Sequence, residues 1–301
     1  MSTPTPARAV AGSVAQRLKE LPVLPSDFGE MIGLDPTTDD FGKRVEKIAM
    51  REPALAARLL SVANAALLGS QAAIKTIDGA IVRMGSRRVA ALVTSFAAMR
   101  IFTPTSEAQR DLWRHALSCA VAAAEIAGRA GTGIEPQQAY VAGLLHDIGR
   151  FVLGDDVPVD EGAAFVPDWS RDPGPCAIEK EAVGVDHAEI GLVAAREWRL
   201  PRELWAALRV HHHHGDLEGV VPAHVAQLVR VVQQADALSE FLLGPGRGAA
   251  TLAPAELTPK LAFWCVAPSW GAPPLAPAAL APLVPGIWTQ ASEQFGALAL
   301  G

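Results

Sequence analysis

Residues 141–152 read Val-Ala-Gly-Leu-Leu-His-Asp-Ile-Gly-Arg-Phe-Val. Their apolar residues recur at helical spacing, which predicts one buried helix. His146 and Asp147 stand side by side inside this stretch. An imidazole and a carboxylate are costly to bury unless something binds them, and a divalent metal ion suits both. The stretch therefore predicts a metal site whose other ligands come from elsewhere in the chain.

The composition supports a sizeable core and narrows the classes of function. Half of the 301 residues are apolar, and the formal net charge is −6. This charge argues against a nucleic-acid binder, which normally has a basic face. The three cysteines are widely spaced and odd in number, which favours reduced thiols over a disulfide framework.

We expect a cytoplasmic protein without a membrane segment. The longest apolar stretch, residues 89–102, is too short to span a bilayer and contains Arg100. Residues 1–20 have no uninterrupted apolar core, so they are predicted to be a loose tail rather than a signal peptide.

Helical patterns fill the chain, and no alternating strand pattern persists. The sequence therefore predicts an all-α protein. In the first block the expected helices cover residues 26–34, 41–50, 52–68, 74–84 and 87–102. A turn-rich stretch at residues 103–107 precedes a second helical block.

Several helices of the second block carry a polar residue on or beside an apolar stripe. Asp186 and Glu189 predict a capping box that places His187 in the first turn of a helix. A single inward histidine is most often a hydrogen-bonded core residue, and the run 211–214 could be only a polar helix end. Five histidines and two aspartates at inward positions favour a shared metal site: His115, His146, Asp147, His187, His211, His212 and Asp236.

These segments, taken in order, resemble the HDOD family, a regulatory branch of the HD phosphohydrolase superfamily. In the first block the resemblance rests on residues 21–25 (Leu-Pro-Val-Leu-Pro), 52–64 and 77–85. In the second it rests on residues 113–115, 144–149, 184–189, 209–212 and 235–236.

The resemblance implies a division of the chain. An N-terminal helical subdomain, residues 21–105, would pack on an HD-like metal-binding helical core, residues 106–243. Residues 1–20 would be a tail, and residues 244–301 a Pro/Ala-rich extension packed on the core.

The resemblance also implies two metal ions. In related HD-GYP phosphodiesterases the matching series would give one ion to His115, His146, Asp147 and Asp236. A second ion would share Asp147 and take three histidines, His187, His211 and His212. Because residues 211–214 are all histidine, the pair that matches His211 and His212 could be shifted by one residue. An imidazole-rich shell suits iron, manganese or zinc.

Two functions follow as hypotheses. The first is a bacterial cytoplasmic signalling module that acts through a protein partner or a nucleotide ligand and carries a metal site. The second is an active metal-dependent phosphohydrolase on a nucleotide or cyclic nucleotide. There Asp147 and Arg150 would be catalytic, Arg150 standing where HD-GYP enzymes have lysine and still able to hold phosphate. The Gly-Tyr-Pro motif of those enzymes is absent. A helical scaffold without metal is a third possibility.

Overall fold

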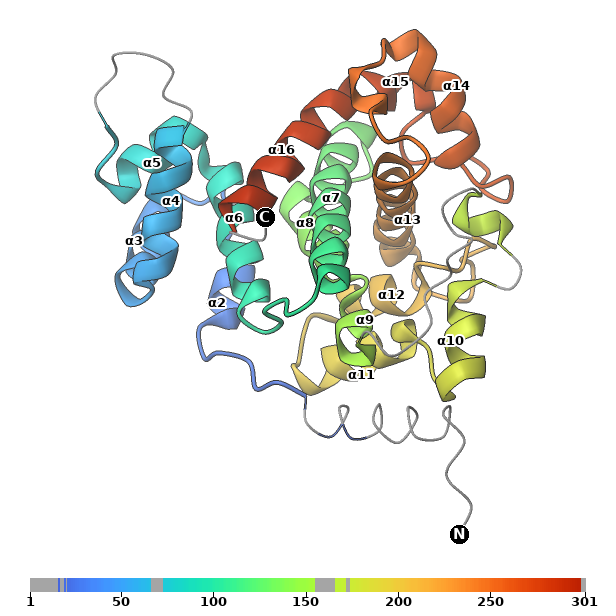
Figure 1. The fold of residues 1–301 in the computed structure, drawn as a ribbon, viewed down its shortest axis with the longest axis horizontal. Helices are drawn as coiled ribbons and strands as arrows, with labels where there is room; N and C mark the ends of the chain where they lie inside the picture. Colours follow the sequence, from blue (N-terminus) through green and yellow to red (C-terminus); the bar gives the residue numbers. More distant parts are fainter. Residues whose placement is uncertain are drawn as a thin grey trace. The chain divides into compact units, whose positions relative to one another are not determined.

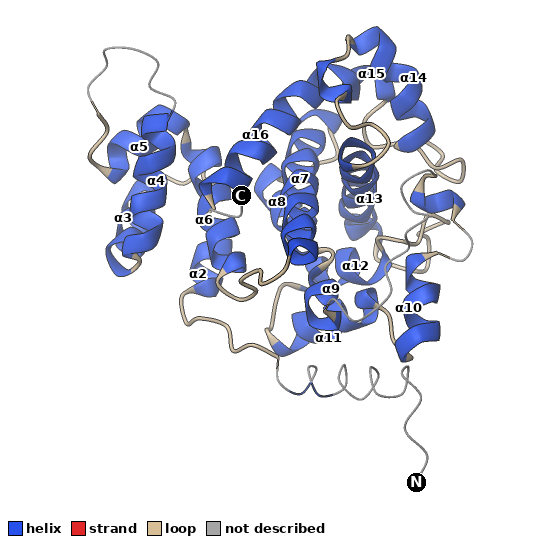
Figure 2. Cartoon of the chain, viewed as in Figure 1, coloured by secondary structure: helices blue, strands red, loops and turns tan. Residues whose placement is uncertain are grey.

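The computed structural model describes residues 16, 19, 21–65, 73–154, 166–171 and 174–298. Within these residues every regular element is a helix and no strand occurs (Figures 1 and 2). The predicted all-α class is confirmed. The predicted tail, residues 1–20, lies almost wholly outside the described residues.

The chain separates into two compact units. Val23–Pro104 with Glu293–Gly301 form one, called here the N-terminal unit. Met1–Pro22 with Thr105–Ser292 form the other, called here the site unit. The division into four segments that the resemblance implies stays a prediction.

Among its described residues, the N-terminal unit contains the helices α2 (Phe28–Ile32), α3 (Phe41–Arg51), α4 (Pro53–Ala65), α5 (Ile77–Met84) and α6 (Ser86–Met99). The α3 helix buries Phe41, Val45, Ile48 and Ala49, the apolar face that its sequence predicts. The α5 helix begins at residue 77 rather than 74 because Thr76 caps it, its hydroxyl accepting from the Gly79 amide. The end predicted for α4, at residue 68, lies outside the described residues.

Asn64 ties the end of α4 to the segment that precedes α5. Its side-chain amide donates to the carbonyl of Ile74 over 2.9 Å and accepts from the Ile74 amide over 2.8 Å. A partly buried side chain therefore replaces backbone pairing between two segments ten residues apart.

Three helices form the centre of the site unit: α7 (Glu107–Ala130), α8 (Pro136–Leu145) and α13 (Ala223–Leu243). The α7 helix packs on both of the others (Figure 1). Small residues permit the close approach of α7 and α8, since a Cβ on Gly143 would lie 2.9 Å from the carbonyl oxygen of Cys119.

The shorter helices of the site unit are α9 (Ile148–Leu153), the 3₁₀ turn η2 (Asp168–Ser170), α10 (Pro175–Val183), α11 (His187–Glu197) and α12 (Arg202–Val210). The predicted capping box of α11 is present, with Asp186 accepting from the Glu189 amide. The α9 and α11 helices pack closely at Gly149.

The remaining elements are η3 (Ala249–Thr251), α14 (Pro254–Trp264), α15 (Pro277–Leu280), η4 (Ala281–Leu283) and α16 (Val284–Ala297). Buried Gln234 of α13 donates to the Leu275 carbonyl over 2.7 Å and accepts from its amide over 2.9 Å. The Trp264 ring lies 5.8 Å from the Phe241 ring, centroid to centroid. These contacts attach the segment around residues 264–275 to α13.

The prediction of one helix over residues 141–152 is wrong. The α8 helix ends at Leu145, His146 and Asp147 form a turn, and α9 begins at Ile148. The His146 ring donates from Nδ1 to the Gly143 carbonyl over 2.7 Å, so a side chain takes an oxygen that helix continuation needs. Likewise α12 ends at Val210, so the run of histidines at residues 211–214 lies beyond the helix.

Candidate metal centre

The seven candidate ligands meet in the site unit, although they come from separate elements. His115 lies on α7, His146 and Asp147 between α8 and α9, and His187 at the start of α11. His211 and His212 follow α12, and Asp236 lies on α13. Because each helix end or inward position supplies only one or two ligands, the packing of the unit assembles the cluster.

Asp147 connects two groups of donors. Its Oδ2 lies 3.8 Å from His115 Nε2 and 3.7 Å from His146 Nε2. Its Oδ1 lies 3.2 Å from His187 Nε2 and 3.3 Å from His211 Nε2. One carboxylate therefore faces a different set of imidazoles with each oxygen.

Asp236 completes the first group. Its Oδ1 lies 3.0 Å from His115 Nε2 and 3.4 Å from His146 Nε2. The two Nε2 atoms are 3.2 Å apart.

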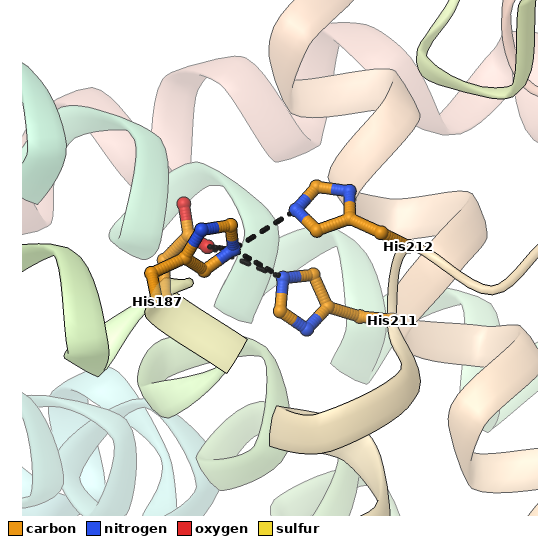
Figure 3. A group of neighbouring side chains, drawn as sticks. His187, His211 and His212 are labelled. Carbon is orange, nitrogen blue, oxygen red and sulfur yellow. Dashed lines mark hydrogen bonds and ion pairs between the residues drawn. The ribbon is translucent and has the colours of Figure 1, made fainter. Parts of the chain in front are cut away.

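The second group is drawn in Figure 3, where three imidazole rings point at one another. His187 Nε2 lies 3.1 Å from His211 Nε2 and 3.0 Å from His212 Nε2. With bonds of about 2.0–2.1 Å, neighbouring donors on one metal ion lie about 3.0–3.4 Å apart. The spacings within the second group fall in this range, as do those among His115, His146 and Asp236. Asp147 Oδ2 lies farther from the imidazoles of the first group, at 3.7–3.8 Å.

In each of the five candidate histidine ligands Nδ1 has an acceptor, which places the proton of the neutral ring on Nδ1. The Nδ1 of His146 contacts the Gly143 carbonyl, and that of His211 the Leu208 carbonyl. The Nδ1 of His115 lies 3.2 Å from Ser239 Oγ, whose own proton goes to the His115 carbonyl.

Two of the histidines contact carboxylates instead. His187 Nδ1 lies 2.6 Å from Glu179 Oε2, and His212 Nδ1 lies 2.8 Å from Asp168 Oδ2. When the five rings are neutral and carry their protons on Nδ1, the Nε2 lone pairs point toward one another. Asp147 Oδ1 is buried among them without a hydrogen-bond donor. Converging lone pairs and an orphaned carboxylate oxygen fit a cation in each group.

The electrostatics keep both carboxylates of the site ionised. Burial raises the pKa of Asp147, but Arg150 and the surrounding imidazoles outweigh it and hold that pKa well below the usual range. Asp236 is likewise ionised, because His146 and His115 offset its burial and lower its pKa. Burial lowers the pKa of His211 to about 3, so this ring is neutral. Ionised carboxylates and neutral imidazoles are the forms that ligate.

Arg150 lies against the candidate ligands, with its Nε 3.1 Å from Asp147 Oδ2. The guanidinium therefore compensates the charge of the carboxylate that connects the two groups of imidazoles. Its side chain is 19% exposed, so it also reaches the solvent side of the cluster.

Solvent reaches the cluster at two of its histidines. The side chains of His146, His187 and His211 are fully buried, whereas His115 is 16% and His212 13% exposed. A cleft borders His212, with Lys180, Arg209 and Val210 in its wall.

The four histidines at residues 211–214 make three different kinds of contact. His211 and His212 face Asp147 and His187. His213 is directed away, with Nε2 3.0 Å from the Asp216 carbonyl. His214 Nε2 lies 2.5 Å from Asp168 Oδ2. The pair 211–212, and not the pair 213–214, therefore lies beside Asp147 and His187.

Sequence reasoning missed the carboxylates that back His187 and His212. Glu179 carried a usable signal, because it lies between Pro175 and Val183 on the buried stripe of α10, four residues from each. Asp168 carried none, because it lies in a 3₁₀ turn without periodicity. Arg171 holds it, with Nη1 3.5 Å from Asp168 Oδ1 and Nη2 donating to Glu240 over 2.8 Å.

No helix among the described residues is long and apolar enough to cross a membrane.

An HD-like, all-α site unit with a His/Asp cluster is the architecture that the sequence resemblance implies. The HDOD domain family model matches residues 21–214, and the chain belongs to this family. An uncharacterised protein of Treponema pallidum (strain Nichols) is 28% identical over 204 residues, which are 68% of this chain and 40% of that protein. The chain thus spans less than half the length of that relative.

Solved structures share the fold. A proposed phosphohydrolase from Shewanella amazonensis SB2B aligns with a TM-score of 0.65 and 24% identity over 95% of this chain and 98% of its own. An HDOD domain protein of unknown function from Geobacter sulfurreducens aligns with a TM-score of 0.61 and 21% identity over 95% and 98% of the two chains.

Proposed function

We propose that this chain is a regulatory HDOD protein whose site unit holds two divalent metal ions and binds a phosphate-bearing nucleotide there. The observation that carries the proposal is the carboxylate of Asp147, which faces a separate group of imidazole Nε2 atoms with each oxygen. A hydrogen-bonded core would satisfy Asp147 Oδ1 with a donor, and none is present.

Each ion has a defined set of residues. His115, His146, Asp147 and Asp236 would hold one, called here position A. Asp147, His187, His211 and His212 would hold the other, called here position B. Iron, manganese and zinc suit such imidazole-rich sets better than calcium. When bound, two divalent ions offset by two carboxylates supply a net charge of about +2, which attracts phosphate and acidifies a bound water.

Hydrolysis of the bound phosphate compound is a second candidate function. It is favoured by the exposure of His115 and His212, because a purely structural metal site is closed to solvent. In this function Asp147 would act as the bridging ligand and Arg150 would compensate charge beside the phosphate. The similar structure named as a proposed phosphohydrolase agrees with this direction.

A role in signalling, in the cytoplasm and through a protein partner, is the remaining part of the proposal. It comes from the regulatory character of the HDOD family, to which the chain belongs. No residue of the described surface is assigned to that partner.

Metal content of the purified chain tests the proposal. Mass spectrometry after anaerobic purification with iron or manganese should find about two ions per chain, as a seven-ligand centre requires. Asp147→Ala should lose both, because Asp147 belongs to both positions. His213→Ala is the matched control, since its side chain is directed away from the cluster. Wild-type protein without stoichiometric metal would contradict both candidate functions.

The loaded protein then separates the two candidates. Binding of a nucleotide without turnover, abolished by Asp147→Ala, supports the regulatory function. Metal-dependent cleavage of a phosphodiester or phosphomonoester, abolished by the same change, supports the hydrolase.

A further inference from the structure

The two metal positions differ in what lies behind their histidines. In position A the Nδ1 atoms contact neutral oxygens, the Gly143 carbonyl and the Ser239 hydroxyl. In position B two of the three Nδ1 atoms contact carboxylates, at 2.6 Å for Glu179 and 2.8 Å for Asp168. This difference concerns the groups behind the ligands and is separate from the identity of the ligands.

Both carboxylates are built into the structure. Glu179 is 6% exposed and also accepts from the His187 backbone amide over 2.8 Å, so one carboxylate fixes both the ring and the start of α11. Asp168 is 4% exposed and is held by Arg171 and His214 as well as by His212. Burying a carboxylate requires this degree of pairing.

A carboxylate behind an imidazole changes the imidazole as a ligand. It draws the Nδ1 proton, increases the electron density on Nε2 and fixes the ring orientation, and loss of such a partner typically lowers metal affinity by about 10- to 100-fold. His187 and His212 gain this effect, whereas His115 and His146 do not.

The direct donors differ in the same direction. Position A offers two imidazoles and two carboxylates, and position B offers three imidazoles and the one shared carboxylate. Imidazole donors suit zinc and ferrous iron, whereas carboxylate-rich sets also accept manganese or magnesium. Position B therefore differs from position A both in its donor atoms and in the carboxylates that contact the Nδ1 atoms of its histidines.

We infer that the two positions are inequivalent: position B is the tighter, zinc- or iron-selective one, and Asp168 and Glu179 are its positioning residues. The inference rests on the proposed two-metal centre. It assigns roles to Asp168 and Glu179 in metal affinity and not in any chemical step.

Zinc titration of the chelator-treated full chain, in competition with a chromophoric chelator, tests the inference. The wild type should bind two ions with distinct affinities. Asp168→Asn and Glu179→Gln should each weaken the tighter ion by about 10- to 100-fold and leave the weaker one unchanged. Ser239→Ala should do the reverse, because it removes the acceptor behind His115. His213→Ala should match the wild type.

Two further measurements exclude a general loss of structure. In a His115→Ala background, which leaves only position B complete, Asp168→Asn should weaken the single remaining ion, and Asp168→Glu should restore part of the affinity. The visible absorption of cobalt(II) bound in that background should change with Glu179→Gln, because the basicity of a ligand changes. Asp168 lies in η2 and Glu179 lies on α10, so if one variant misfolds, the other still tests the inference.

The outcomes distinguish the two proposals. A wild-type chain that binds no zinc would overturn the two-metal centre, and this inference with it. Two ions of equal affinity, or variants that weaken both ions alike, would overturn the inequivalence while the two-metal centre stands.

Discussion

The protonation of individual residues links metal binding to pH. In the metal-free site, burial lowers the pKa of His146, but nearby groups including Asp147 and Asp236 outweigh it and raise the pKa well above 6.5. Burial and Arg150 lower the pKa of His187, but Asp147 and Glu179 raise it overall. Both rings therefore take up a proton more readily in the metal-free site than a free imidazole does.

The sign of the pH dependence follows from these raised pKa values. Protonated His146 and His187 stabilise the metal-free fold fully below about pH 6.5, and this stabilisation is lost as pH rises through the raised values. A metal ion must displace the protons, so its affinity should rise with pH, by about tenfold per unit for each proton released.

Calorimetric zinc titration in two buffers of different protonation enthalpy measures the protons released. We expect zinc binding to the wild type to release protons at pH 7, and to release more of them than zinc addition to Asp147→Ala does. Equal heats in the two buffers would contradict the link.

At the scale of the elements, the approach of α9 and α11 depends on one glycine. A Cβ on Gly149 would lie 1.9 Å from the backbone carbonyl oxygen of His187, an overlap that backbone movement alone can relieve. Gly149→Ala should therefore destabilise the protein by about 3 kcal/mol and weaken position B, which contains His187.

Gly191 on the facing helix is the matched control for this contact. Its Cβ would meet the nearest atom, on Leu208, at 3.5 Å, which is an ordinary contact. Gly191→Ala should change the free energy of unfolding by less than about 1 kcal/mol, since alanine also favours the helix. Urea denaturation compares the two variants, and equal losses would show that the α9–α11 approach is adaptable.

The sequence predicts the helices better than their interruptions. The 3.6-residue period identifies the buried face of α3 and the start of α11, because local patterns determine both. The break at His146 and Asp147 depends on a side-chain bond to Gly143 and on the tertiary approach at Gly149, which no local pattern records.

The same distinction applies to the candidate site. Inward helical positions identify residues such as Asp236, and they could have identified Glu179 by the same rule. Asp168 is remote in sequence from His212 and lies in a 3₁₀ turn, so only the folded chain relates them. That the seven convergent residues are metal ligands stays a prediction.

At the scale of the whole molecule, the two units should respond separately to changes made in each. All seven candidate ligands lie in the site unit, and Asn64 with its bonds to Ile74 lies in the N-terminal unit. Metal at about 100 times its dissociation constant adds about 2.7 kcal/mol to the fold that binds it. Loss of the partly buried Asn64 bonds costs about 1–3 kcal/mol.

Scanning calorimetry with and without chelator should therefore show two transitions, of which chelation lowers only one. Asn64→Ala should lower only the other, and Asn64→Asp should lower it less, because the carboxylate still accepts from the Ile74 amide. Asp147→Ala should abolish the effect of chelator without moving the transition that Asn64→Ala lowers. A single transition that moves with both changes would instead mean that the units unfold together, and metal occupancy would then stabilise the whole chain.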